Sequence, residues 1–179
     1  MELCQKLDIP MGSHDDDRLD RVHFLAAHGV AISEFPKTMD VASEAVRLGL
    51  KTVVGGPNAV RGGSHLKWLS AATAIGAEVA SALCSDYHPT ILPQAVFRLY
   101  RQGVADLPGL VRCVTLNPAM AAGLPDRGVL QAGKRADLVE IACDQAGWAR
   151  VVSTWSQGRL VAHFPDTARI MSAPSLIAH

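Results

Sequence analysis

Short apolar runs alternate with helical stretches four times over in the amino-terminal part of the chain. The apolar runs, at 9–13, 30–35, 51–55 and 79–85, are predicted strands, and the last is the least regular because alanine fills much of it. In the segment after each strand, apolar side chains recur at helical spacing. Repeated strand–helix units are typical of an α/β fold, in which right-handed crossovers place the strands in one parallel sheet.

The predicted helices lie after these strands, and the chain changes character beyond Gln102. The helices are 16–29, 39–49, 66–76 and 91–103, followed by a helical stretch at 107–124. Three further strands are predicted at 136–142, 150–156 and 159–164. Gln157 and Gly158 join the last two strands in a hairpin-like turn, so the chain closes with a small β element.

The composition predicts a folded domain with a sizeable core, because 49% of the 179 residues are hydrophobic. Lys plus Arg and Asp plus Glu both number 17, and this zero net charge argues against nucleic acid and membrane surfaces as partners. The four cysteines are scattered without a CxxC pair, which favours reduced thiols in a cytoplasmic protein. The sequence shows no signal peptide and no apolar stretch of membrane-spanning length.

Ionisable side chains follow each of the four predicted strands. In parallel sheets, chemistry collects at the carboxyl ends of the strands, because the loops there meet at one edge. The recurrence therefore predicts a functional site at that edge. Its candidate residues, strand by strand, are His14, Asp15, Asp16 and Asp17; Glu34; Asn58, Arg61 and His65; and Asp86, Tyr87 and His88.

The segment 55–65, GGPNAVRGGSH, combines four glycines with one arginine and one histidine. Glycine lets backbone N–H groups turn toward an anion, and the planar guanidinium of Arg61 can bind phosphate oxygens in pairs. His65 can donate a hydrogen bond or move a proton. The segment is thus either a phosphate cradle or, in the simpler interpretation, a flexible surface loop. It is not a nucleotide-binding P-loop, because the GK[ST] ending is missing.

Three strand-end residues each allow two interpretations. His14, followed by three acids, is a metal ligand supported by carboxylates, or Asp15 or Asp16 simply caps the next helix. Glu34 binds a cation or forms a structural ion pair with Arg61. Asp86 is a catalytic carboxylate or another helix cap.

Several motifs together resemble the amidohydrolase superfamily. TLNPA at 115–119 and GKRADLVEI at 133–141 are similar to its carboxyl-terminal part. SHDD, EFPKT, PNAVRGGSH and SDYHP narrow the resemblance to the diphosphatases that act on α-D-ribose 1-methylphosphonate 5-triphosphate in the carbon–phosphorus lyase pathway. The resemblance covers about 1–163, and it departs from the family's usual SHSGN where this chain has SHLKWL.

The resemblance implies the fold of a metal-dependent (β/α)8 barrel of TIM type, of which this chain is the carboxyl-terminal half. Residues 1–125 would hold strands five to eight with their helices, 126–164 the last strands of a small composite β domain, and 165–179 a loose tail. A whole barrel needs about 250 residues, and the superfamily's amino-terminal His-x-His pair and bridging ligand have no counterpart in this sequence. An internal start, a gene fragment and a truncation are all compatible with this.

The resemblance also implies roles within the site. A divalent metal ion (zinc, manganese or magnesium) would be bound by His14 and Asp86, with Asp15 and Glu34 as further candidate ligands. Glu34 stands where many superfamily members carry a histidine, which argues against a complete binuclear centre. Asp86, as acceptor of the water proton, and His65 would be catalytic. The implied substrate-binding residues are Asn58, Arg61, Gly62, Gly63, His65 and Tyr87.

The reaction that the resemblance implies is hydrolysis of the ribose 5-triphosphate to the 5-phosphate and diphosphate. The implied partners are a small phosphorylated sugar phosphonate, a second copy of the chain and pathway enzymes acting before and after it. Two alternatives stay open, since fold alone does not fix function. One is a hydrolase of the C–N bond of a cyclic amide, which an assay of diphosphate release would distinguish. The other is an inactive half-barrel remnant.

Overall fold

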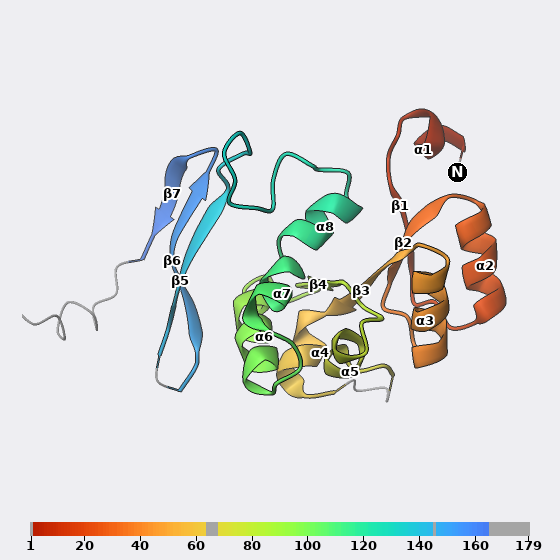
Figure 1. Cartoon of the computed structure of the whole chain (residues 1–179), viewed down its shortest axis with the longest axis horizontal. Coiled ribbons are helices and arrows are strands. Elements are labelled where there is room, and N and C mark those ends of the chain that lie inside the picture. The colour runs from red at the N-terminus through yellow and green to blue at the C-terminus, as the bar shows by residue number, and fades with distance from the viewer. Residues whose placement is uncertain (1, 64–67, 145, 165–179) are drawn as a thin grey trace, which may run out of the picture. The chain divides into compact units, whose positions relative to one another are not determined.

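The computed structural model describes residues 2–63, 68–144 and 146–164. The chain divides into two compact units, Met1–Lys134 and Arg135–His179 (Figure 1). The first unit contains four strands and all of the described helices, and the second contains a three-stranded sheet. Within the described ranges, no helix is long and apolar enough to cross a membrane.

The first unit alternates strands and helices, as the sequence predicts. Its strands are β1 (Met11–His14), β2 (Val30–Glu34), β3 (Lys51–Gly55) and β4 (Ala82–Cys84). Its helices are α1 (Glu2–Lys6), α2 (Leu19–Ala27), α3 (Met39–Arg47), α4 (Gly56–Arg61), α5 (Ala71–Gly76), α6 (Ile91–Arg101), α7 (Leu107–Arg112) and α8 (Leu116–Ala121). The strands pair in parallel in the order β1-β2-β3-β4, so the α/β prediction is confirmed and four carboxyl ends meet at one edge.

The register of the sheet separates the side chains at this edge into two rows. One row is His14, Glu34, Val53 and Ala82, and the next is Ser13, Ser33 and Thr52. Successive side chains of a strand point to opposite faces, so the two rows face in opposite directions. Ser33 and Thr52 are fully buried, whereas the row that contains His14 and Glu34 lines a pocket on the other face.

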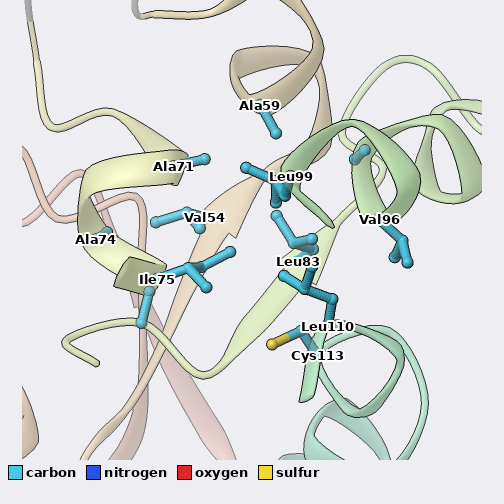
Figure 2. Close-up of a cluster of buried hydrophobic side chains, with 12 residues drawn as sticks. Val54, Ala59, Ala71, Ala74, Ile75, Leu83, Val96, Leu99, Leu110 and Cys113 are labelled. Atoms are coloured by element: carbon cyan, nitrogen blue, oxygen red, sulfur yellow. The ribbon is translucent and has the colours of Figure 1, made fainter. Parts of the chain in front are cut away.

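The main core of the first unit joins β3 and β4 to helices α5, α6 and α7 (Figure 2). Val54 and Leu83 of the strands lie among Ile75, Leu99 and Leu110 of these helices. A smaller cluster packs α2 and α3 against the sheet and consists of Val22, Val30, Val41, Ala45 and Leu50. Helices therefore cover one face of the sheet along its whole width, and the site at the edge is built on this rigid layer.

Two predicted helices differ from the structure. The helix expected over 66–76 begins only at α5, because Ser70 caps it by accepting a hydrogen bond from the Thr73 N–H at 3.0 Å. The helix expected over 107–124 is divided into α7 and α8. Thr115, between them, has non-helical φ and ψ of −129° and −85°.

The second unit is an antiparallel sheet in the order β5-β6-β7. Its strands are β5 (Leu138–Cys143), β6 (Ala149–Ser156) and β7 (Arg159–His163). Gln157 and Gly158 both have left-handed φ, 52° and 76°, and form the predicted two-residue hairpin turn. The division of the chain falls between Lys134 and Arg135, inside the segment 126–164 predicted to hold this β element. The tail predicted at 165–179 lies outside the described residues.

Leu99 provides a test of the core, because its side chain has 0% exposed surface. Leu99→Ala removes buried methyl groups and leaves a cavity, so we expect the free energy of unfolding to fall by about 2–5 kcal/mol. Leu130→Ala is the matched control, because Leu130 is 86% exposed. We expect it to change stability by less than about 0.5 kcal/mol. Urea unfolding followed by circular dichroism measures both variants, and equal effects would contradict this core.

Candidate active site

The carboxyl ends of β1 to β4 bring the predicted site residues into two adjoining groups. His14 and Glu34 lie on the face of the sheet opposite the two apolar clusters and line one pocket, to which Pro118 and Ala121 of α8 also contribute. Gly62 is the C-cap of α4, and His65 lies outside the described residues. A second pocket, here called the rim pocket, is lined by Asp15, Asn58, Arg61, Gly63, Asp86 and Tyr87 among others.

His14 and Glu34 face each other across the paired ends of β1 and β2. The His14 Nε2 atom lies 3.9 Å from the Glu34 Oε2 atom, and its Nδ1 atom lies 3.4 Å from Asp15 Oδ1. Phe35 packs edge-on against the imidazole, with ring centroids 5.1 Å apart. The imidazole is thus held between two carboxylates and an aromatic ring, while 58% of the His14 side chain stays exposed.

The acids after His14 shape the turn that follows β1. Asp15 has a left-handed φ of 58°, and its N–H donates to the carbonyl of Glu34 at 2.9 Å. The Asp16 side chain is fully buried and accepts hydrogen bonds from the Ser13 and Ser33 hydroxyls. In the described chain, no side chain caps α2, so the alternative in which these acids serve as helix caps is wrong.

Arg61 and Asp86 lie in the wall of the rim pocket. The Arg61 guanidinium lies 5.6 Å from the centroid of the Tyr87 ring, a cation–π contact that orients the positive charge. Asp86 has a left-handed φ of 50°, so the chain turns sharply after β4. Helix α6 begins only at Ile91, after Thr90, so Asp86 is not the helix cap that the sequence allowed. The pocket therefore combines a guanidinium with a strand-end carboxylate.

Two aromatic side chains, Phe35 and Trp68, also line the rim pocket, although the sequence does not predict them. The ammonium of Lys37 lies 4.5 Å from the centroid of the Trp68 ring, so a second cation is held on an aromatic ring of the pocket wall. The only sequence signal is position, because Phe35 directly follows the predicted residue Glu34. Without the structure, an aromatic residue beside a strand end would be predicted to lie in the hydrophobic core.

Asn58 ties the wall of the rim pocket to α4. Its Oδ1 atom accepts the Ala71 N–H at 2.9 Å, and its Nδ2 atom donates to the Leu69 carbonyl at 3.4 Å. The Leu69 N–H in turn donates to the Lys37 carbonyl at 2.9 Å. Because both ends of the amide bind backbone, Asn58 acts on the pocket by holding the segment that carries Trp68.

Two glycines of the segment 55–65, Gly56 and Gly62, serve packing and chain reversal. Gly56 is buried in the first turn of α4, where a Cβ atom would lie 2.8 Å from Ile91 Cγ2 and 3.2 Å from the Cys84 carbonyl oxygen. Gly62, with φ of 86°, ends the helix in the left-handed conformation that favours glycine. The prediction of a loop over this whole segment is therefore wrong, because Gly56–Arg61 form helix α4. Gly56 is needed where this helix packs closely against the end of β4.

Cys84 ends β4 beside the two groups of site residues. Burial raises the pKa of Cys84 to about 12, and the neighbouring charges of Glu34 and Asp86 act in the same direction, against a hydrogen bond from the Asp86 backbone. The thiol is therefore neutral at physiological pH. Since the thiolate is the reactive form, Cys84 is not the nucleophile of this site.

The residues predicted as metal ligands do not form a complete metal site among the described residues. Imidazole and carboxylate donors such as His14 and Glu34 suit zinc and similar divalent ions. Among the described residues, however, no three His, Cys, Asp or Glu side chains form a group that could hold a metal ion. A zinc site takes at least three protein ligands. This part of the chain therefore supplies donors of the right kind for an incomplete set.

The parallel βα units of the first unit agree with the protein family that a sequence comparison assigns to this chain. The sequence profile of the Amidohydrolase family matches residues 6–161 of this chain. The chain belongs to the amidohydrolase family. It thus belongs to a family of hydrolases, and its four βα units correspond to half of a (β/α)8 barrel.

Relatives of known sequence and structure extend this assignment. The chain is 38% identical over 163 residues to the alpha-D-ribose 1-methylphosphonate 5-triphosphate diphosphatase of Escherichia coli (strain K12), covering 89% of this chain and 42% of that enzyme. Among solved structures, Aspergillus niger ochratoxinase shares 16% identity and a TM-score of 0.62, over 89% of this chain and 43% of its own. An uncharacterized metal-dependent hydrolase from Pyrococcus horikoshii shares 15% identity and a TM-score of 0.56, over 75% and 34%.

Asn58→Ala tests the link between α4 and the pocket wall. The substitution leaves the buried Ala71 N–H without its acceptor, so we expect this amide to exchange with solvent about fivefold faster, for a hydrogen bond worth about 1 kcal/mol. The internal control is the Val41 N–H, which is bonded to the Thr38 hydroxyl on α3 at 3.3 Å. Hydrogen exchange by NMR reports both amides, and unchanged protection of Ala71 would rule out the link.

Proposed function

We propose that the chain forms the carboxyl-terminal half of a metal-dependent diphosphatase that converts α-D-ribose 1-methylphosphonate 5-triphosphate to the 5-phosphate and diphosphate. The observation that carries the proposal is the rim pocket, which Arg61 and Asp86 both line. The 38% identity to an enzyme named for this substrate supports the choice of substrate. Structures of the same fold carry different names, so the fold by itself would not select one.

Each pocket residue has a chemical task in the proposed reaction. Arg61 binds phosphate oxygens through charge-assisted hydrogen bonds, and Tyr87 beneath it restricts the orientation of the guanidinium. Asp86 accepts the proton of the water that attacks the α-phosphorus, the bond to the bridging oxygen breaks, and diphosphate leaves with the bonding electrons. His65, the other predicted catalytic and substrate-binding residue, lies outside the described residues and stays a prediction.

A divalent metal ion is part of the proposal. His14 and Asp86 are the proposed ligands, with Asp15 and Glu34 as alternative candidates. Because no three of these side chains form one group among the described residues, the rest of the ligand set would come from outside them. Such an ion, when bound, lowers the pKa of a water molecule and offsets phosphate charge. Positioning and charge stabilisation then account for most of the rate enhancement, as in other phosphoryl transfers.

The test combines this chain with its relative, because the chain spans 42% of the E. coli enzyme. In a chimera, the chain replaces the matching part of that diphosphatase, and diphosphate release from the ribose triphosphate is compared with that of the parent. We expect turnover that EDTA abolishes and a divalent metal restores. The isolated chain, assayed in parallel, should show none, because its ligand set is incomplete. A chimera that folds by circular dichroism but releases no diphosphate would contradict the proposal.

Arg61→Ala in the chimera should weaken substrate binding strongly. Loss of a hydrogen bond between the guanidinium and a charged phosphate costs about 1.5–3 kcal/mol, which corresponds to a rise in KM of about 10–150-fold. Arg61→Lys keeps the charge but loses the planar pair of donors, so we expect only partial recovery. Steady-state kinetics of both variants provide the measurement. Wild-type kcat and KM in Arg61→Ala would remove this residue from the site.

Asp86→Asn separates catalysis from backbone geometry. Asn adopts the left-handed φ of this position as readily as Asp, so the turn after β4 should be preserved. Asn cannot accept the proton, and we expect kcat to fall by about 10²–10⁴-fold, the range for losing a general base. Turnover is measured at equal metal content. Near-normal kcat with the turn intact would exclude Asp86 as the base.

A further inference from the structure

We propose that Asp16 is a positioning residue that holds His14 and Glu34 in register from behind the sheet. The role of this pair in catalysis rests on the proposed function. The contacts of Asp16 with Ser13, Ser33 and Arg21, here called the clamp, do not. The sequence allowed Asp16 to be one of the carboxylates that support His14 or a cap of the next helix, and the structure excludes the cap.

Asp16 is a buried carboxylate with partners on two strands. Its side chain has 0% exposed surface. The Oδ2 atom accepts hydrogen bonds from the hydroxyls of Ser13 on β1 and Ser33 on β2, both at 2.6 Å. The Oδ1 atom lies 3.2 Å from the Nε atom of Arg21 on α2. A buried charge persists only where it is paired, and here the pairing joins two neighbouring strands and a helix.

The clamp lies directly behind the His14–Glu34 pair. Ser13 and Ser33 immediately precede these residues and are themselves paired in the sheet. Side chains alternate between faces, so the serines point toward the helices with Asp16 while the other pair points into the pocket on the opposite face. A slip of one residue between the strands would reverse both faces. One carboxylate oxygen bound to both hydroxyls therefore fixes the register at the point where the pair lies.

Asp16 also connects the pair to the rim pocket through the backbone. Its carbonyl accepts the Lys37 N–H at 2.9 Å, and the Lys37 carbonyl accepts the Leu69 N–H at 2.9 Å. Arg21, which Asp16 holds, donates through Nη2 to the carbonyl of His14 at 3.3 Å. The loops after β1 and β2 and one wall of the rim pocket are thus attached to the same residue.

The test uses the whole chain and histidine-ring NMR spectra recorded at one fixed pH. Asp16→Asn keeps the shape of the side chain but removes the charge that accepts both hydroxyls. We expect the ring nitrogen resonances of His14 to shift, while those of His23, which pairs with Glu44 on the neighbouring helices, stay in place. Asp17→Asn, a change of the exposed neighbouring acid, is the matched control and should move neither ring.

Ser33→Ala provides a second variant if Asp16→Asn does not fold. It removes one of the two hydroxyls, and we expect a smaller shift of the His14 ring in the same direction. Spectra of His14 that coincide with wild type, together with a lower melting temperature, would show that the cluster only stabilises the fold. That result would overturn the positioning role.

Kinetics of the chimera measure the consequence for catalysis. We expect Asp16→Asn to lower kcat by about 10–100-fold, as is typical for residues that orient site ligands. KM should stay within about twofold, because a positioning residue behind the sheet makes no uniform contribution to substrate binding. A wild-type chimera without activity would contradict the diphosphatase proposal and leave the ring spectra to decide on Asp16. An active chimera with unchanged kcat in Asp16→Asn would overturn the positioning role itself.

Discussion

Parallel pairing of β1 to β4 is the constraint from which the rest of the first unit follows. Strands that run in one direction need a helix to return the chain, and these helices supply the apolar layer that buries one face of the sheet. The same direction delivers every strand end to one edge. His14, Glu34, Arg61 and Asp86, far apart in the sequence, therefore gather along that edge without any contact between their own segments having to be specified separately.

The two faces of the sheet edge carry different kinds of polar group. Toward the helices, Asp16, Ser33 and Thr52 are fully buried. The Ser33 hydroxyl donates to Asp16 Oδ2 and the Thr52 hydroxyl to a backbone carbonyl, while Asp16 Oδ1 has only the ion-pair contact with Arg21 among the described residues. Burying such groups is costly unless they are paired, so this side allows few alternative arrangements. On the other face, His14 and Glu34 remain open to the pocket. The buried polar cluster around Asp16 thus supports the exposed pair of His14 and Glu34 on the other face of the sheet.

The sequence predicts the parts of this structure that depend on periodicity. The strands from Val30 and Lys51 start where alternation and apolar runs place them, and the edge is found because ionisable residues follow each strand. Contacts between distant segments escape such reasoning. The sequence places Gly56 in a loop, and only the structure shows that it packs against Ile91. The sequence likewise allows Asp16 to cap a helix, and only the structure shows its hydrogen bond with Ser33. Trp68 is likewise assigned to the pocket only by its tertiary position.

The packing of Gly56 has a consequence for how the pocket can evolve. A methyl group there would collide with Ile91 and with the Cys84 carbonyl, so any replacement would push α4 away from β4 and carry Arg61 with it. Gly63 is the opposite case, since no described atom lies within 4 Å of a Cβ added there. New side chains can enter the rim pocket at one end of the same short segment and not at the other. With respect to the described atoms, a change at Gly63 would therefore disturb the placement of Arg61 less than a change at Gly56.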